Sequence, residues 1–261
     1  ISANPSIAPP KTFVPLKLIT MKTTIIKLTI VLFLATISTS CNIDMLNRVE
    51  GDRNVISEKR QVNEDFSKVK VSSGIDLYIK QGSKTSLTVE ADENLHDIII
   101  TEVVGGKLKI YTEKNIWRAK AKKVYLTVTS LEELTATSGS DVISENTLKV
   151  NDFEVSTSSG ADLRIEVEAN YVVSSSRSGS DLRISGTANT HKTSASSGSS
   201  IKAYSLESKK VTARVSSGAD IGVFASESLN AKASSGRDIR YKGNPKSVDK
   251  KTSSGGGISA R

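Results

Sequence analysis

The sequence predicts an all-β protein, a parallel β-helix in which each coil of about 19 residues contributes two strands. One six-residue phrase, SSGADL at Ser158–Leu163, recurs in eight variants along the chain. From Gly139 to Gly255 the glycines of successive copies are roughly 18–21 residues apart, which is the period of a solenoid. Aromatic residues make up only 5% of the 261 residues, so we expect a thin core of aliphatic and small side chains.

Alignment of the copies on their glycine shows what each coil buries. An apolar residue stands three positions after the glycine in every copy, and mostly small or apolar residues stand five after it and three and five before it. This alternation has the period of two that is typical of half-buried strands. A coil of this length has room for two strands and two turns but for no helix. Each coil is expected to hydrogen-bond to the next, with about 4.8 Å between neighbouring strands.

The phrase itself is predicted to form the turn between the two strands of a coil. Its glycine suits either a positive φ or crowding against the next coil, and its serines can bond to turn backbone groups. The predicted structural turn residues are Gly74, Asp76, Gly139, Asp141, Gly160, Asp162, Gly179, Asp181, Gly198, Gly218, Asp220, Gly236, Asp238 and Gly255.

The aspartate that stands two positions after most of these glycines would form a row of like charges if the coils stack in register. One interpretation is that each carboxylate caps its turn by accepting hydrogen bonds from turn N–H groups. The other is a ladder of cation sites with Asp141, Asp162 and Asp181 as candidate ligands. The calcium-binding nonapeptide repeat also uses Gly-x-Asp, but with a shorter period and more glycines than this sequence has.

The residues before the repeats have the pattern of an export signal. Met21 opens a better leader than the first residue does, so residues 1–20 are expected to be an upstream extension foreign to the natural chain. Residues 21–40 combine two lysines, an apolar run and small residues before a cleavage site, as a signal peptide does. The apolar run Leu28–Ile37 is shorter than the about 20 residues of a transmembrane helix.

Cys41 is the only cysteine, which excludes an intrachain disulfide. The small residues that end at Cys41 resemble a bacterial lipobox, in which the cysteine is lipidated and becomes the mature N-terminus. Ser38 stands where leucine is commoner, so an ordinary secretory signal with a free thiol is the alternative. Lipidation would tether the protein to a membrane, and nothing at Asn42 resembles an inner-membrane retention signal, which favours the outer membrane. The polar residues 41–55 are predicted to be a linker.

Residues 56–130 are expected to form less regular first coils, and residues 131–261 the regular ones. Apolar and polar residues alternate in the first stretch, and Gln81-Gly82 and Gly105-Gly106 are turn signals. The interval from Gly74 to Gly139 is several periods long and leaves room for further coils. Trp117 is expected to cover the end of the core or, alternatively, to contact a sugar or a partner.

Several motifs occur in a characteristic order: Phe66-x-x-Val69-x-Val71 with Gly74-x-Asp76, Gln81-Gly82, Ala91-Asp92-x-Asn94-Leu95, the serial SSGxD phrases, Gly243-Asn244-Pro245 and a final SSGGGI. In this order they resemble the head GIN domain family of auto-transporter adhesins. The resemblance covers 66–261 and implies a single domain over residues 56–261, a right-handed β-helix with a pectate-lyase-like shape. It also implies a secreted or lipid-anchored protein of a family common in Bacteroidetes, without established catalytic residues.

Charge and composition argue against nucleic acid and against catalysis. The formal charge is +8, but residues 1–40 contribute four lysines and no acid, and the remaining charges are interspersed without stacking platforms. His96 and His191 lack metal-ligand spacing, and His191 is expected to face the core. The serines lack a nucleophile elbow and a base. No cofactor is expected.

These observations predict a non-catalytic cell-envelope lipoprotein that binds glycans or surface proteins through the flat faces of a solenoid. The sequence leaves open whether copies associate into homo-oligomers. One alternative is a carbohydrate-active β-helix enzyme that uses the aspartate row with Arg164, Arg183, Arg214, Arg237 and Arg240. The other is a periplasmic scaffold or stress lipoprotein.

Overall fold

The computed structural model describes residues 48–235 and 237–261, which form a β-solenoid, as predicted. The expected leader, the lipidated Cys41 and the turn residue Gly236 lie outside the described residues. Within the described part of the chain, no helix is long and apolar enough to cross a membrane.

The secondary structure is almost entirely β. The elements are β1 (Arg48–Glu50), β2 (Val55–Arg60), β3 (Lys68–Val71), β4 (Asp76–Gln81), β5 (Ser86–Asp92), the 3₁₀ turn η2 (Glu93–Leu95), β6 (Ile99–Val104), β7 (Lys107–Thr112), β8 (Asn115–Arg118), β9 (Lys122–Val128), β10 (Glu133–Ala136), β11 (Asp141–Ser144), β12 (Leu148–Lys149), β13 (Asp152–Thr157), β14 (Asp162–Arg177), β15 (Asp181–Ser196), β16 (Ser200–Val215), β17 (Asp220–Ala233), β18 (Asp238–Lys242), β19 (Ser247–Thr252) and β20 (Gly257–Ala260).

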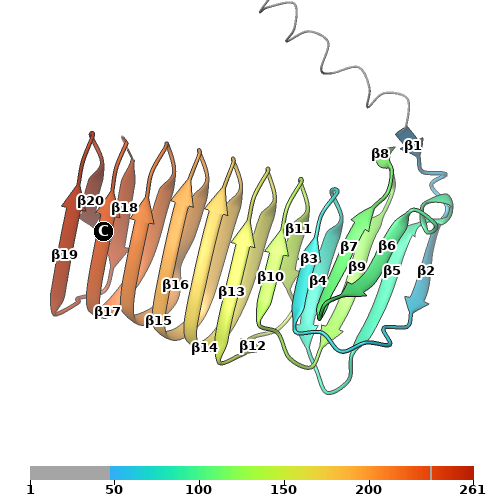
Figure 1. Cartoon of the computed structure of the whole chain (residues 1–261), viewed down its shortest axis with the longest axis horizontal. Helices are drawn as coiled ribbons and strands as arrows, with labels where there is room; N and C mark the ends of the chain where they lie inside the picture. The colour runs from blue at the N-terminus through green and yellow to red at the C-terminus, as the bar shows by residue number, and fades with distance from the viewer. Residues whose placement is uncertain (1–47, 236) are drawn as a thin grey trace, which may run out of the picture. The chain divides into compact units, whose positions relative to one another are not determined.

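The regular coils stack in parallel, as Figure 1 shows, and β14 and β15 pair in register along their whole length. The first half of β14 pairs with β11 and its second half with β13, so one bent strand serves both faces of the solenoid. β15, β16 and β17 repeat this course, and Asp162 pairs with Asp181 and Leu163 with Leu182. The core lies between the two faces and is made of the inward residues of every coil.

The stacking order of the first coils differs from their order in the sequence. β3 and β4, the first copy of the repeat, pair directly with β10 and β11, although all of β5–β9 lies between the two copies in the sequence. The intervening chain lies on the side of β3 and β4 that faces away from β10 and β11, where β7 pairs with β3 and β9 with β4. β2, β5 and β6 add antiparallel strands there. Residues 56–130 therefore hold two parallel coils, β3–β4 and β7–β9, and their irregularity comes from the antiparallel strands β2, β5 and β6 that close this end of the sheet ladder.

The folded unit begins earlier than expected. β1 pairs in parallel with β8, so the folded unit extends back to Arg48, inside residues 41–55 that were predicted to be a linker. The 3₁₀ turn η2 follows β5 directly. Leu95 at its end is fully buried.

In every phrase turn a serine has a positive φ. The glycine that follows it also has a positive φ wherever that glycine is described. In one coil Ser159 has φ 54° and Gly160 has φ 72°. Two successive positive φ values are those of a type I′ turn, and the Ala161 amide closes this one by donating to the Ser158 carbonyl at 3.3 Å. A Cβ added at Gly139, Gly160 or Gly179 would meet no atom within 4 Å, so conformation rather than crowding requires glycine at these positions. The glycine amides also join coils: Gly139 N donates to the carbonyl of Ser159 at 3.1 Å.

We expect Gly160→Ala to lower the free energy of unfolding by about 1 kcal/mol, or the Tm by about 3 °C, because an L side chain is strained at positive φ. Gly160→Asn is the matched control, since asparagine tolerates this region better than alanine does. Urea and thermal unfolding of the two variants measure the effect. Equal stability of wild type and Gly160→Ala would contradict the conformational explanation.

The middle of the core is unusually polar, and its hydroxyls bond to one another. The residue directly after the phrase glycine is buried in six coils, and it is serine in three of them, Ser140, Ser180 and Ser199. Ser180 Oγ donates to Thr157 Oγ1 at 3.0 Å, and Ser199 Oγ donates to the carbonyl of Ser176 at 2.7 Å. The expectation that phrase serines bond to turn backbone groups is confirmed at this position, since Ser180 Oγ also donates to the Arg177 carbonyl at 2.8 Å.

Candidate binding groove

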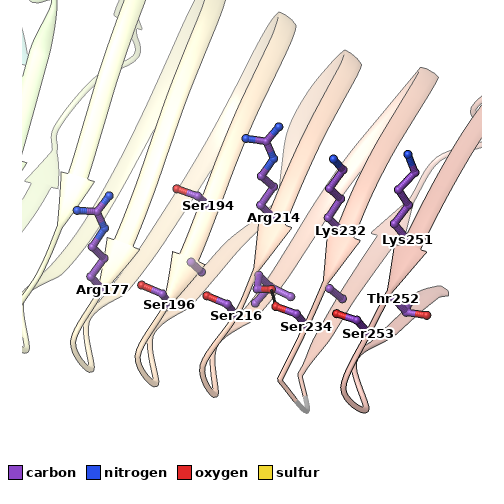
Figure 2. A pocket seen from close by; sticks show the side chains of 13 residues that line it. Arg177, Ser194, Ser196, Arg214, Ser216, Lys232, Ser234, Lys251, Thr252 and Ser253 are labelled. Carbon is purple, nitrogen blue, oxygen red and sulfur yellow. Dashed lines mark hydrogen bonds between the residues drawn. The ribbon is translucent and has the colours of Figure 1, made fainter.

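A shallow groove of about 480 Å³ crosses the outer face of the sheet that leads into the phrase turns (Figure 2). Strands β14, β15, β16, β17 and β19 and the turns that follow them contribute to it. The groove is lined by Arg177, Ser194, Ala195, Ser196, Arg214, Val215, Ser216, Lys232, Ala233, Ser234, Lys251, Thr252 and Ser253. We refer to these residues as the basic groove.

Two outward rows of the repeat provide its polar side chains. The position four before the glycine holds Ser194, Arg214, Lys232 and Lys251, which are direct register partners in β15, β16, β17 and β19. The position two before the glycine holds Arg177 and then the serines at 196, 216, 234 and 253. Because alternate residues of a strand face the same side, both rows point away from the core, and Figure 2 shows Arg214, Lys232 and Lys251 side by side.

The electrostatics of the basic groove are one-sided. Arg177, Arg214, Lys232 and Lys251 are exposed, and none forms an ion pair with a described residue. No acidic residue lines the groove. The neighbouring outward row carries Lys192 on β15 and Asp249 on β19, where Asp249 accepts a hydrogen bond from Asn230. The groove can therefore attract an anionic ligand without first breaking an internal ion pair.

The predicted aspartate row exists, but on the other sheet. Asp141 and Asp162 are register partners, as are Asp162 and Asp181. Burial raises the pKa of Asp141, and the charges of its neighbours Asp76 and Asp162 raise it further. Burial also raises the pKa of Asp76, against the opposing charges of two nearby lysines.

The expected turn caps are not found. Among the described residues, no turn N–H donates to a carboxylate of this row, because the amides are already used between coils. For example, the amide of Asp162 donates to the Ser140 carbonyl at 3.1 Å. The carboxylates of the later coils are held by cations instead, with Arg237 at 3.7 Å from Asp220 and Arg240 at 3.4 Å from Asp238.

The cation ladder at Asp141, Asp162 and Asp181 stays a prediction. The carboxylates follow one another along the coils, and no group of three or more His, Cys, Asp or Glu side chains in the described part of the chain could hold a metal ion. Calcium titration followed by thermal unfolding checks the idea, since a structural ion raises the Tm by mass action. An unchanged Tm across millimolar calcium would retire it.

The residues of the enzyme alternative come together only in part. Arg164 and Arg183 are register partners beside the aspartate row, and Arg237 and Arg240 form ion pairs with its later members. Arg214 lies in the basic groove, on the sheet that leads into the turns. Four of the five arginines therefore lie with the aspartate row, and only Arg214 lies apart from it.

Both histidines are structural. His191 is fully buried, as predicted, and its Nε2 lies 2.9 Å from Ser174 Oγ. Burial lowers the pKa of His191 to about 4. His96 is buried beside Glu58, with 3.2 Å between Nδ1 and Oε2.

Trp117 does not cover the core. It lies on β8 with 55% of its surface exposed, and the guanidinium carbons of Arg48 and Arg118 lie 5.2 and 5.1 Å from its ring centroid. The preferred expectation of a core-covering tryptophan is therefore wrong. The ring is stabilised by cation–π contacts, and its exposure is compatible with the alternative role of a partner contact.

The fold and the groove define a class of protein: a β-solenoid with an extended polar surface. Within that class, the family model described as "Putative auto-transporter adhesin, head GIN domain" matches residues 65–245. The chain belongs to this family. Membership in an adhesin-like family indicates an exported or cell-surface protein. Among curated proteins no match was found.

Solved structures with the same fold include proteins of Bacteroides and Parabacteroides species. A putative adhesin from Bacteroides fragilis is 21% identical with a TM-score of 0.76, over 82% of this chain and 100% of that one. A putative lipid binding protein from Parabacteroides distasonis is 22% identical with a TM-score of 0.69, over 82% and 99%. A putative adhesin from Parabacteroides merdae is 19% identical with a TM-score of 0.66, over the same shares. At these identities the likeness establishes the fold alone.

Proposed function

We propose that this protein is a non-catalytic adhesin of the cell envelope, anchored by lipid at Cys41, whose flat sheet faces bind glycans or surface proteins. The observation that carries this proposal is the basic groove. It is a continuous surface built from five neighbouring strands, with exposed cations that have no partner among the described residues. Such extended surfaces are what solenoids offer to ligands.

The family name and the repetitive placement of the aspartates both support binding over catalysis. General acid–base chemistry on a polysaccharide needs an acid and a base within reach of one glycosidic bond. The aspartates occupy the same place in successive coils, where they repel one another, and Arg214 lies in the other sheet. Incubation with uronic-acid polysaccharides should therefore release no new reducing ends, and their release would establish the enzyme alternative.

A glycan array probed with the purified protein tests the proposal, together with an adherence assay that compares the wild-type strain with a deletion strain. Binding to a defined set of glycans and weaker adherence of the deletion strain are expected. Negative results in both assays would overturn the adhesin proposal. Cross-linking in intact cells would then identify the partner that the periplasmic scaffold alternative requires.

Two further measurements address the anchor and the location. Mass spectrometry of the mature protein should find a lipidated Cys41 at its N-terminus, and an unmodified cysteine or cleavage elsewhere would exclude the anchor. Protease treatment of whole cells should degrade a surface-displayed protein. Full protection in intact cells would favour a periplasmic role.

A further inference from the structure

We propose that the basic groove binds a linear polysaccharide that carries carboxylate or sulfate groups along its length. This inference rests on the proposed adhesin function and names the class of its ligand. It assigns the recognition to Arg177, Arg214, Lys232 and Lys251, with the intervening serines as hydrogen-bonding partners.

The register of the coils places the cations in line. Arg214 pairs with Lys232 and Lys232 with Lys251, so these three charges repeat at the strand spacing of about 4.8 Å. An extended pyranose chain advances by a similar distance with each sugar. A chain laid across the strands can therefore meet one coil with each sugar, and a negative group on successive or alternate sugars meets a cation.

The serines fit the same ligand. Ser196, Ser216 and Ser234 lie in one row directly beside the cation row, each half-buried at the start of its turn. A hydroxyl both donates and accepts hydrogen bonds, as the hydroxyls of sugars do. The groove thus offers both a charge and a neutral hydrogen-bonding group in three of the five coils it crosses, those of β16, β17 and β19.

Other polyanions fit the groove less well. Single-stranded nucleic acids are held by aromatic stacking as well as by charge, and no aromatic residue lines the groove. Attachment to an anionic membrane surface is strengthened by apolar side chains that enter the bilayer. The exposed large apolar residues of the described chain are Ile56, Val104, Trp117, Ile143 and Val248, and none of them lines the groove.

Titration calorimetry with polygalacturonate, a linear polyuronate, tests the proposal, with neutral dextran as the comparison ligand. We expect wild type to bind polygalacturonate and not dextran, with an affinity that falls as salt is added. The triple variant Arg214→Glu/Lys232→Glu/Lys251→Glu should bind about a hundredfold more weakly, because each cation near an anionic surface contributes roughly fivefold. The altered side chains are exposed, so the variant should keep the stability of wild type.

The matched control is Lys59→Glu/Lys209→Glu/Lys246→Glu. It changes the net charge by the same amount at three exposed lysines outside the groove. This control should keep at least half of the wild-type affinity. Equal losses in both triple variants would show a nonspecific charge effect and would overturn the assignment to the groove.

Phosphatidylglycerol vesicles and single-stranded DNA test whether the groove binds a membrane or a nucleic acid instead of a polysaccharide. If wild type binds vesicles of phosphatidylglycerol or single-stranded DNA through the groove but does not bind polygalacturonate, the proposal is overturned in favour of that ligand. If the glycan array finds only neutral glycans, the groove proposal fails while the adhesin proposal stands. If neither glycans nor cells are bound, both fail.

Discussion

Acidification from pH 7.5 to pH 4 is expected to cost wild type about 3 kcal/mol of folding stability through His191 alone. His191 is fully buried, and burial lowers its pKa from 6.5 to about 4. The unfolded chain therefore binds a proton between these two pH values while the folded protein does not. Stability contributed by the neutral side chain is present above pH 6.5 and declines as the pH falls toward 4.

His191→Val should remove most of this pH dependence. The positions that flank His191 in the neighbouring coils are Val172 and Val211, so valine suits the site. Ser174 Oγ loses the imidazole but keeps its bond to Thr193 Oγ1 at 2.8 Å.

Urea unfolding at intervals from pH 7.5 to pH 4 gives the free energy of unfolding of wild type and of His191→Val. The difference between the two values at each pH is the contribution of this histidine, because the other titrating groups are the same in both proteins. Parallel pH profiles would show that His191 does not have the lowered pKa that its burial implies.

Asp92→Ala is expected to lower the free energy of unfolding by about 3 kcal/mol or more. The carboxylate of Asp92 is fully buried and accepts hydrogen bonds from the backbone amides of Arg53, Lys120 and Ala121 at 2.9–3.1 Å. Removal of the carboxylate leaves these amides without their acceptor, at about 1 kcal/mol or more each. The damage should be concentrated where β1 and β8 join the first strands.

Asp97→Ala is the control, because Asp97 is exposed and close in sequence. Urea unfolding gives the stability difference, and limited proteolysis with mass spectrometry shows whether cleavage increases near residues 48–54.

The folding stability contributed by Asp92 should be lost in a lower pH range than the stability contributed by His191. Burial raises the pKa of Asp92, but the bonds from the backbone amides outweigh it and the pKa is lowered from 3.8. Stability from Asp92 is therefore complete above pH 3.8 and is lost as the pH falls through the lower value. An Asp92→Ala variant as stable as Asp97→Ala at pH 7 would refute the structural role of this carboxylate.

The regular part of the fold was predictable because each coil repeats the same local chemistry. Positive φ at the turn favours glycine, and inward positions are mostly small or apolar, so the period of the phrase reports the period of the coils. The capping strands were not predictable in the same way. β7 and β9 stack outside β3 and β4, and nothing in the local pattern encodes the order in which coils are placed.

The basic groove was missed for a related reason. Arg214, Lys232 and Lys251 belong to successive coils, so each lies a full repeat from the next and no charge cluster is visible along the chain. Their common position, four before the phrase glycine, was the available signal. The aspartate row was predictable because the acids belong to the phrase itself. The turn amides beside them donate to carbonyls of neighbouring coils rather than to the carboxylates.

The central claim is that ligand is bound by a surface continuous over successive coils rather than by a single pocket. The most direct test is the affinity of the purified protein for oligogalacturonates of increasing length. Affinity should rise with each added sugar until the chain spans the strands of the basic groove, and then level off. A monosaccharide that binds as tightly as the long chain, or an affinity independent of length, would contradict the account.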